Sequence, residues 1–211
     1  MQTKSLIAVA LVLGFGGMAM ADTYNNNETP RYTVVQSDGA VELRDYAPRL
    51  MAEATVGGSQ SQAVSAGFSI LAGYIFGGNE SAAKVAMTTP VAQAPARAST
   101  EKIAMTTPVA QSASGAGWTV QFMMPSTYTL DTLPKAKDPA IRFVELPSER
   151  QAVLRFSGLA GTGALDRHTA ELQAWMGAKG LKPLRGPLFF FYDPPWTLPW
   201  SRRNEVAFVV Q

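Results

Sequence analysis

The chain has 211 residues, of which 46% are hydrophobic and 16% are charged, with a formal net charge of +2. That length and apolar content suit one sizeable globular domain. A charge excess this small, without any block of Lys or Arg, gives no basis for a nucleic-acid partner. The chain has no cysteine, which excludes disulfides, thiolate metal sites and a cysteine nucleophile.

Residues 1–21 predict a signal peptide. Lys4 precedes the apolar run Leu6–Gly17, and Ala19-Met20-Ala21 is a small-x-small cleavage site. The run is shorter than the roughly 20 apolar residues that cross a bilayer. We therefore expect export to the periplasm or secretion, without stable membrane insertion after cleavage. The polar residues 22–30 that follow are expected to be flexible.

A ten-residue phrase occurs twice, 18 residues apart, as KVAMTTPVAQ (residues 84–93) and KIAMTTPVAQ (residues 102–111). Apolar side chains alternate in both copies, which is the period of a half-buried strand. The segment between the copies has no periodicity and is typical of a loop. The stretch therefore predicts a β-hairpin, with Met105 on its inward face either filling the core or contacting a ligand.

Similar patterns predict the other elements. Period-two runs bounded by turn residues predict strands at 31–36, 41–46, 50–56, 118–124, 141–146, 151–157, 188–192 and 205–210. Helical periodicity predicts one helix from Ser59 or Ser61 to Ile75 and a second over 164–178. Each half then has the order strand-strand-helix-strand-strand. This order predicts an α+β fold, in which two helices pack on one curled antiparallel sheet.

The first predicted helix carries a single apolar stripe. Its members recur four, three and four residues apart, at Val64, Phe68, Leu71 and Ile75. Gly67 and Gly73 lie inside this helix, where each costs about 1 kcal/mol relative to Ala. Such a cost is tolerated where something lies close to the helix backbone. Either the sheet or a flat ligand would meet that condition.

Few residues point to chemistry. The single histidine, His168, lies on the apolar face of the second predicted helix, as a structural residue or as a haem ligand. Arg202 and Arg203 follow a loop rich in Trp and Pro. An Arg pair there either clamps a carboxylate or stacks on a ring, or it forms an ion pair with Glu205 or Asp193. No Gly-x-Ser-x-Gly motif and no carboxylate pair with metal-ligand spacing occur, so hydrolase and metal chemistry are poorly supported.

Six short phrases together identify a family resemblance. They are KIAMTTPV (102–109), GGNES (77–81), FMMP (122–125), LRFSGL (154–159), YDPPW (192–196) and RRNEV (202–206). The sequence resembles the SOUL haem-binding family, and especially its exported bacterial members, from about Arg31 to Gln211. The resemblance implies a single domain over residues 31–211, folded as a distorted antiparallel β-barrel of two pseudo-symmetric halves with two helices.

The resemblance also implies a function. Members of the family bind haem or a related porphyrin without converting it, in an apolar groove beside the first helix. The positions implied to contact the ring are Phe68, Leu71, Ala72, Ile75, Met105, Tyr192, Arg202 and Arg203. The alternative is that another small, flat, hydrophobic compound is bound or enzymatically converted in the same groove. An enzyme needs a positioned acid, base or nucleophile, and the sequence offers only isolated Glu and Tyr residues such as Tyr74 and Glu53.

Overall fold

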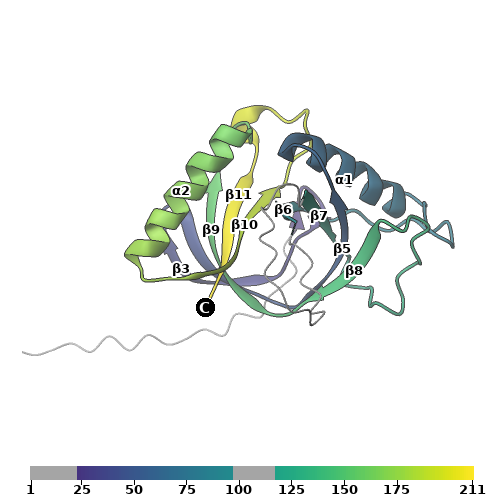
Figure 1. The fold of residues 1–211 in the computed structure, drawn as a ribbon. Coiled ribbons are helices and arrows are strands. Elements are labelled where there is room, and N and C mark those ends of the chain that lie inside the picture. Colours follow the sequence, from purple (N-terminus) through teal and green to yellow (C-terminus); the bar gives the residue numbers. More distant parts are fainter. Residues whose placement is uncertain (1–22, 97–116) are drawn as a thin grey trace, which may run out of the picture.

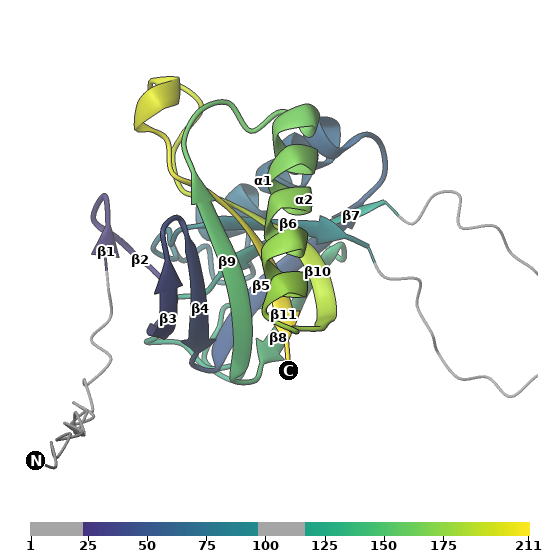
Figure 2. The same cartoon turned by 90° about the vertical axis from the view of Figure 1, so that its left-hand side faces the viewer.

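The computed structural model describes residues 23–96 and 117–211. The strands of its main sheet are β3 (Tyr32–Asp38), β4 (Val41–Tyr46), β5 (Arg49–Val56), β6 (Val91–Pro95), β7 (Trp118–Met123), β8 (Ile141–Leu146), β9 (Glu149–Phe156), β10 (Pro183–Phe191) and β11 (Asn204–Val210). Helices α1 (Gln60–Ile75) and α2 (Thr162–Ala178) pack on this sheet, as Figure 1 shows. The remaining elements are the 3-10 helix η1 (Pro199–Ser201) and a small hairpin of β1 (Thr23–Tyr24) and β2 (Asn27–Glu28), which stands beside β3 in Figure 2.

The main sheet has the order β3-β4-β9-β11-β10-β6-β7-β5-β8, and all its neighbouring strands are antiparallel. Apart from β3, this order is symmetric about the β10–β6 pair. The first half runs from β4 to β7 and the second from β8 to β11, and each consists of two strands, a helix and two strands. The first strand of each half pairs with the second strand of the other half: β4 pairs with β9, and β8 pairs with β5. The α+β fold with two similar halves is therefore confirmed. The sheet is strongly curled but not closed, because β3 and β8 remain its two edges.

Helix α1 starts and packs as its sequence dictates. Ser59 caps it and forms a reciprocal capping box with Gln62, which satisfies backbone donors that the first turn leaves unpaired. The buried face of α1, with Leu71, Tyr74 and Ile75, packs on β5 and β7 and forms the α1 core. Burial of side chains of this size stabilises the fold by roughly 1.5–3 kcal/mol each.

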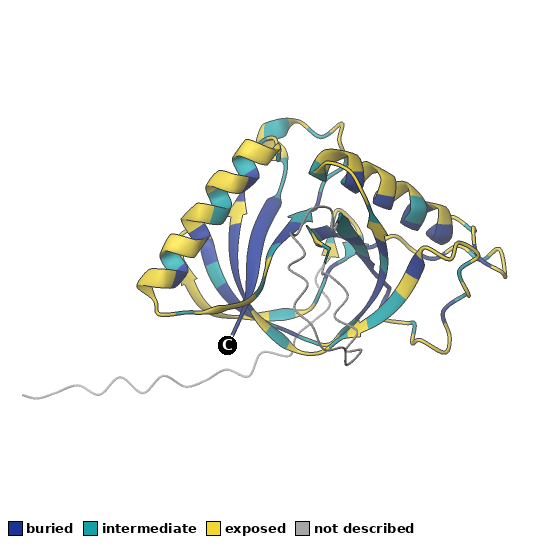
Figure 3. Ribbon diagram, viewed as in Figure 1, coloured by how far each residue is buried: buried dark blue, intermediate teal, exposed yellow. Residues whose placement is uncertain are grey.

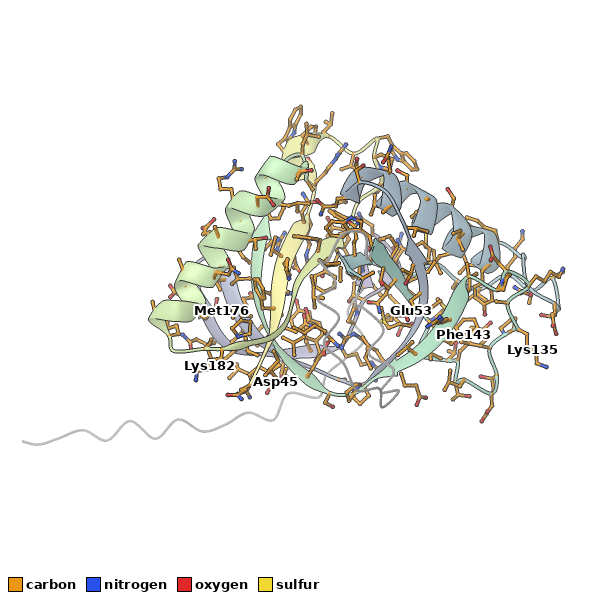
Figure 4. The ribbon with its side chains drawn as sticks, in the orientation of Figure 1. Asp45, Glu53, Lys135, Phe143, Met176 and Lys182 are labelled. Atoms are coloured by element: carbon orange, nitrogen blue, oxygen red, sulfur yellow. The ribbon has the colours of Figure 1, made fainter. Side chains whose placement is uncertain are left out.

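Helix α2 covers the other half in the same way. Leu165, Leu172 and Met176 are buried against β9 and β11 and form the α2 core. Figure 4 labels one residue at each of the two cores, Met176 of the α2 core and Phe143 on β8, which packs against the α1 core. Both helices therefore bury one face and expose the other, as Figure 3 shows.

Most predicted elements match the observed ones within a few residues, but two regions differ from the prediction. Strand β10 starts at Pro183, earlier than the predicted 188, because irregularities in its pairing with β11 accommodate Pro183 and Pro187. Residues 23–28, expected to be flexible, form the β1–β2 hairpin, whose Tyr24 hydroxyl donates to Asp193. Among the described residues, no helix is long and apolar enough to cross a membrane.

The predicted hairpin of the two phrase copies is wrong in its first strand. Residues 84–90 do not form a strand, and β6 begins only at Val91 and pairs with β7. The neighbouring Thr88 and Thr89 are both buried, since Thr88 donates to the Met123 carbonyl and Thr89 to the Tyr192 carbonyl. These hydrogen bonds to other segments take the place of the strand pairing that the alternation predicted. The second copy, including Met105, lies outside the described residues.

Candidate ligand-binding site

The outward face of α1 is unusual in carrying no charge. None of the 16 residues of α1 is acidic or basic. Its exposed positions are Ser61, Gln62, Ser65, Ala66, Phe68, Ser69 and Gly73. Helix α2 is the natural comparison, because Asp166, Arg167 and Glu171 are exposed on it. Charged side chains usually cover the solvent face of a surface helix, whereas this face carries uncharged polar and small residues together with Phe68.

Two exposed phenylalanines flank small residues on this face. Phe68 is 38% exposed and Phe76, the residue that ends α1, is 66% exposed. They are eight residues apart, which corresponds to about 12 Å along a helix axis. At about 100° per residue, the small residues between them, Ser69, Ala72 and Gly73, fall on the same side. We call these five residues the α1 shelf.

The predicted apolar stripe mostly supports α1 from beneath. Leu71 and Ile75 are 0% and 1% exposed in the α1 core, and Ala72 is 8% exposed. Phe68 is the stripe residue among the predicted contacts that reaches the surface substantially, and its ring meets Phe122 edge-on at 5.3 Å. Of these four predicted contacts, the structure therefore exposes only Phe68 at the α1 shelf, where Ala72 is buried, whereas Leu71 and Ile75 face the sheet.

The two glycines of α1 have different surroundings. A Cβ on Gly67 would lie 2.5 Å from a methyl carbon of Val120 in β7, so close contact with the sheet explains this glycine. A Cβ on Gly73 would have no neighbour within 4 Å. Gly73 therefore leaves the helix backbone open at the α1 shelf, which is the position where a flat ligand would come closest.

Tyr192 and Arg203 belong to a buried ionic cluster around Glu205. The Glu205 carboxylate is fully buried and accepts hydrogen bonds from Arg44 at 3.0 and 3.2 Å and from Arg203 at 2.7 and 3.0 Å. The Tyr192 hydroxyl also donates to it, at 2.9 Å. Of the roles considered for Arg203, the structure supports the ion pair with Glu205 and stacking on a ring, since the guanidinium carbon lies 4.0 Å from the centroid of the Tyr192 ring. Arg44 was missed, because no local pattern links residues so far apart in sequence.

The cluster holds its acidic and phenolic groups in fixed protonation states. Burial alone would raise the pKa of Glu205, but Arg44 and Arg203 outweigh burial, so the pKa is lowered. Burial, and then the Glu205 charge, raise the pKa of Tyr192. At neutral pH Glu205 is therefore a carboxylate and Tyr192 a neutral phenol. The two arginines and the tyrosine occupy the carboxylate as acceptor, which leaves it poorly placed to act as a base.

Arg202 holds the loop that precedes β11. Its guanidinium donates to the backbone carbonyl of Thr197 at 2.8 Å and also to that of Pro195. The loop presents Trp196, 83% exposed, and Trp200, 71% exposed. Figure 1 shows this segment at the end of the molecule where the two helices approach each other. The sequence marked the loop by its Trp and Pro content, but gave no sign that both tryptophans would face solvent.

His168 is already engaged within its own half of the molecule. Its Nδ1 lies 3.0 Å from a carboxylate oxygen of Glu171, and its ring stacks on Phe156 with centroids 4.2 Å apart. These contacts favour the structural interpretation of this histidine over the haem-ligand interpretation. In the part of the chain that the structure describes, no group of three or more His, Cys, Asp or Glu residues is placed to hold a metal ion.

Two hollows lie away from α1. Each has a volume of about 570 Å³. One is lined by the ends of β3, β4, β10 and β11, and the other by residues around Leu50, Met124 and Tyr128. Neither is lined by any residue predicted to contact the ligand. We give more weight to the α1 shelf, because the predicted contact residue Phe68 is exposed there.

Comparisons with known proteins agree on the fold. The family model described as "SOUL heme-binding protein" matches residues 27–209, whereas no curated protein matches. The C-terminal domain of EcmrR aligns with a TM-score of 0.58 and 12% identity, over 85% of this chain and 98% of that domain. A hydrolase from Listeria innocua aligns with a TM-score of 0.53 and 12% identity, over 84% of this chain and 94% of its own. At such identities the structures show a shared fold and nothing about function.

Proposed function

Because the chain belongs to the SOUL heme-binding protein family, we propose that it binds haem or a related tetrapyrrole on the α1 shelf and does not convert it. The observation that carries this proposal is the uncharged outward face of α1, with exposed Phe68 and Phe76 at either end. A flat macrocycle lying on such a face gains mainly from burial of apolar surface, roughly 25 cal/mol per Å². The open backbone at Gly73 supports a close approach of the ring.

The side chains of the α1 shelf suit the macrocycle rather than a metal ion. Phenylalanine, serine, alanine and glycine supply none of the His, Cys, Met or Tyr ligands that hold haem iron. In this proposal the ring is held by contact and its propionates stay near water. Arg202 uses two of its N–H groups on loop carbonyls, so we do not assign it to a propionate. Arg203 is already paired with Glu205.

A binding role without catalysis is supported by the Glu205 cluster. Glu205, Tyr192 and Tyr46 are buried, and the two arginines neutralise the carboxylate. The alternative function, enzymatic conversion of another flat hydrophobic compound on the same face, would need an acid, base or nucleophile at that face. The shelf side chains, with one serine hydroxyl that donates to the Ser65 carbonyl, do not supply an activated group of this kind.

Titration of haem and of metal-free porphyrin, followed by absorption and by quenching of tryptophan fluorescence, tests the proposal. We expect saturable binding of both rings with similar affinity. Ser69→Glu should weaken binding by at least about tenfold, because a ring on the shelf would desolvate the new carboxylate. His168→Ala and the matched control Ala170→Glu, an exposed position on α2, should leave binding unchanged.

Two results would reject the proposal. One is the lack of saturable binding of either ring to the wild-type protein. The other is binding of haem alone that disappears in His168→Ala, since this would make iron coordination by α2 the basis of binding. Circular dichroism of each variant checks that a loss of binding is not a loss of fold.

We also propose that the protein is exported and acts in the periplasm or outside the cell. The support is the Lys4, apolar run and Ala19-Met20-Ala21 pattern of residues 1–21. Sequencing the N-terminus of the protein isolated from its host should give Asp22 as the first residue. A cytoplasmic protein that retains Met1 would contradict export.

A further inference from the structure

The first copy of the repeated phrase, residues 84–93, is held by contacts with several elements. The Val85 N–H donates to the Ile75 carbonyl at 2.9 Å, and the Val85 side chain is 4% exposed in the α1 core. Thr89 donates through its hydroxyl to the Tyr192 carbonyl at 3.1 Å, and Gln93 donates through its amide to the Gln60 carbonyl at 2.8 Å. We call the surroundings that receive this copy the β6 site.

The second copy repeats the side chains that the β6 site recognises. Residues 102–111 differ from residues 84–93 at one position in ten, where Ile103 replaces Val85. The buried threonines and the glutamine recur as Thr106, Thr107 and Gln111. Ile is larger than Val by one methylene and is equally apolar, so placing it at the buried Val85 position carries an overpacking cost.

The connection after β6 is also long enough for the second copy to pair with β7 in place of the first, in a register shifted by 18 residues. Residues 96–117 separate β6 from β7, although antiparallel neighbours are usually joined by loops of about two to five residues. The Ala96 N–H donates to the Gly117 carbonyl at 3.0 Å and closes the β6–β7 pairing. A shift of 18 residues places Ser114 where Ala96 is. Only Gly115 and Ala116 then separate it from Gly117, and a two-residue connection with Gly first is the sequence signature of a type II′ hairpin.

We propose that the β6 site accepts either copy of the phrase, so that the folded protein exchanges between two registers 18 residues apart. In the second register, the 18 residues leave the β6–β7 connection and lengthen the connection after Ala83. The total length of the two connections is unchanged. Because the entropy of loop closure varies only with the logarithm of loop length, this transfer does not favour either register strongly.

Substitutions that disable one copy at a time test the proposal. Val85→Asp and Ile103→Asp each place a carboxylate in the buried position of one register. We expect each single variant to keep a cooperative thermal transition within a few degrees of the wild type, because the other copy takes its place. The double variant should lose the transition. Deleting residues 84–101, which joins Ala83 to Lys102, should give a chain that folds cooperatively with the second copy alone.

Other outcomes overturn the exchange. If Val85→Asp is as unfolded as the double variant while Ile103→Asp resembles the wild type, the site accepts only the first copy. If Ile103→Asp alone unfolds the protein, it accepts only the second. A double variant as stable as the wild type, or a deletion variant that does not fold, likewise contradicts the proposal.

Discussion

Glu205 illustrates how single residues hold this fold together. A fully buried carboxylate is tolerated only with counter-charges and hydrogen bonds, which Arg44, Arg203 and Tyr192 supply from three different strands or strand ends. Glu205→Gln removes the negative charge, so the guanidinium groups of Arg44 and Arg203 lose their shared counter-charge. We expect the free energy of unfolding in urea to fall by about 3–5 kcal/mol. Asp45→Asn, which breaks the half-exposed pair with Arg150, should cost at most about 1 kcal/mol.

The same residue links stability to pH. The pKa of Glu205 is lower in the folded protein than its unfolded value near 4.5. Its contribution is therefore fully present above pH 4.5 and is lost as the pH falls through the lower folded pKa. Urea unfolding between pH 7 and pH 3 should show a steeper acid loss of stability for the wild type than for Glu205→Gln. Equal slopes would show that Glu205 titrates alike in both states.

At the level of elements, helix α1 shows what periodicity predicts and what it leaves open. The spacing of its apolar residues predicted the helix and the face that is buried. It did not predict that the sheet would cover Leu71 and Ile75 so completely, because a stripe does not identify its partner. The uncharged opposite face was readable in the sequence. The contribution of Phe76 to this face was not, since this residue lies just beyond the predicted end of the helix at Ile75.

The two glycines of α1 should respond to substitution in opposite directions. Gly67→Ala puts a methyl group 2.5 Å from a Val120 methyl carbon, and overpacking of this kind costs about 1–3 kcal/mol. Gly73→Ala meets nothing within 4 Å and should stabilise the helix by up to about 1 kcal/mol. Urea unfolding measures both. Changes of the same sign would show that the packing of α1 on β7 differs from the one described.

The repeated phrase shows why strand predictions fail near special contacts. Alternating residue types suggested a strand from Lys84 onward, but Thr88 and Thr89 both bury hydroxyls that donate to carbonyls of other segments. Such contacts depend on residues distant in sequence, Met123 and Tyr192, and leave no local period. The sequence therefore located the segment correctly but not its conformation.

For the whole molecule, element order was predictable and strand pairing was not. Turn signals and periodicity yielded two halves of strand-strand-helix-strand-strand, and the structure confirms them. Which strands become neighbours depends on contacts between the halves. The exchange of β4 and β8 between halves has no local signature, and the same holds for the pairing of Arg44 with Glu205 across the sheet. Predictability therefore declined as the sequence separation of the contacting residues increased.

The strand exchange between halves implies that they unfold together. Strand β4 completes the sheet beneath α2, and β8 completes the sheet beneath α1, so neither half keeps all its pairings without the other. Leu71→Ala, in the α1 core and 0% exposed, should cost about 2–5 kcal/mol. Native-state hydrogen exchange should show this loss in the slowest amides of β9 and β11 as well as in those of β5 and β7. The matched variant Leu172→Ala, in the α2 core, should lower protection in β5 and β7 in turn. If either variant lowers protection only in its own half, the halves are separate folding units and the exchanged strands do not couple them.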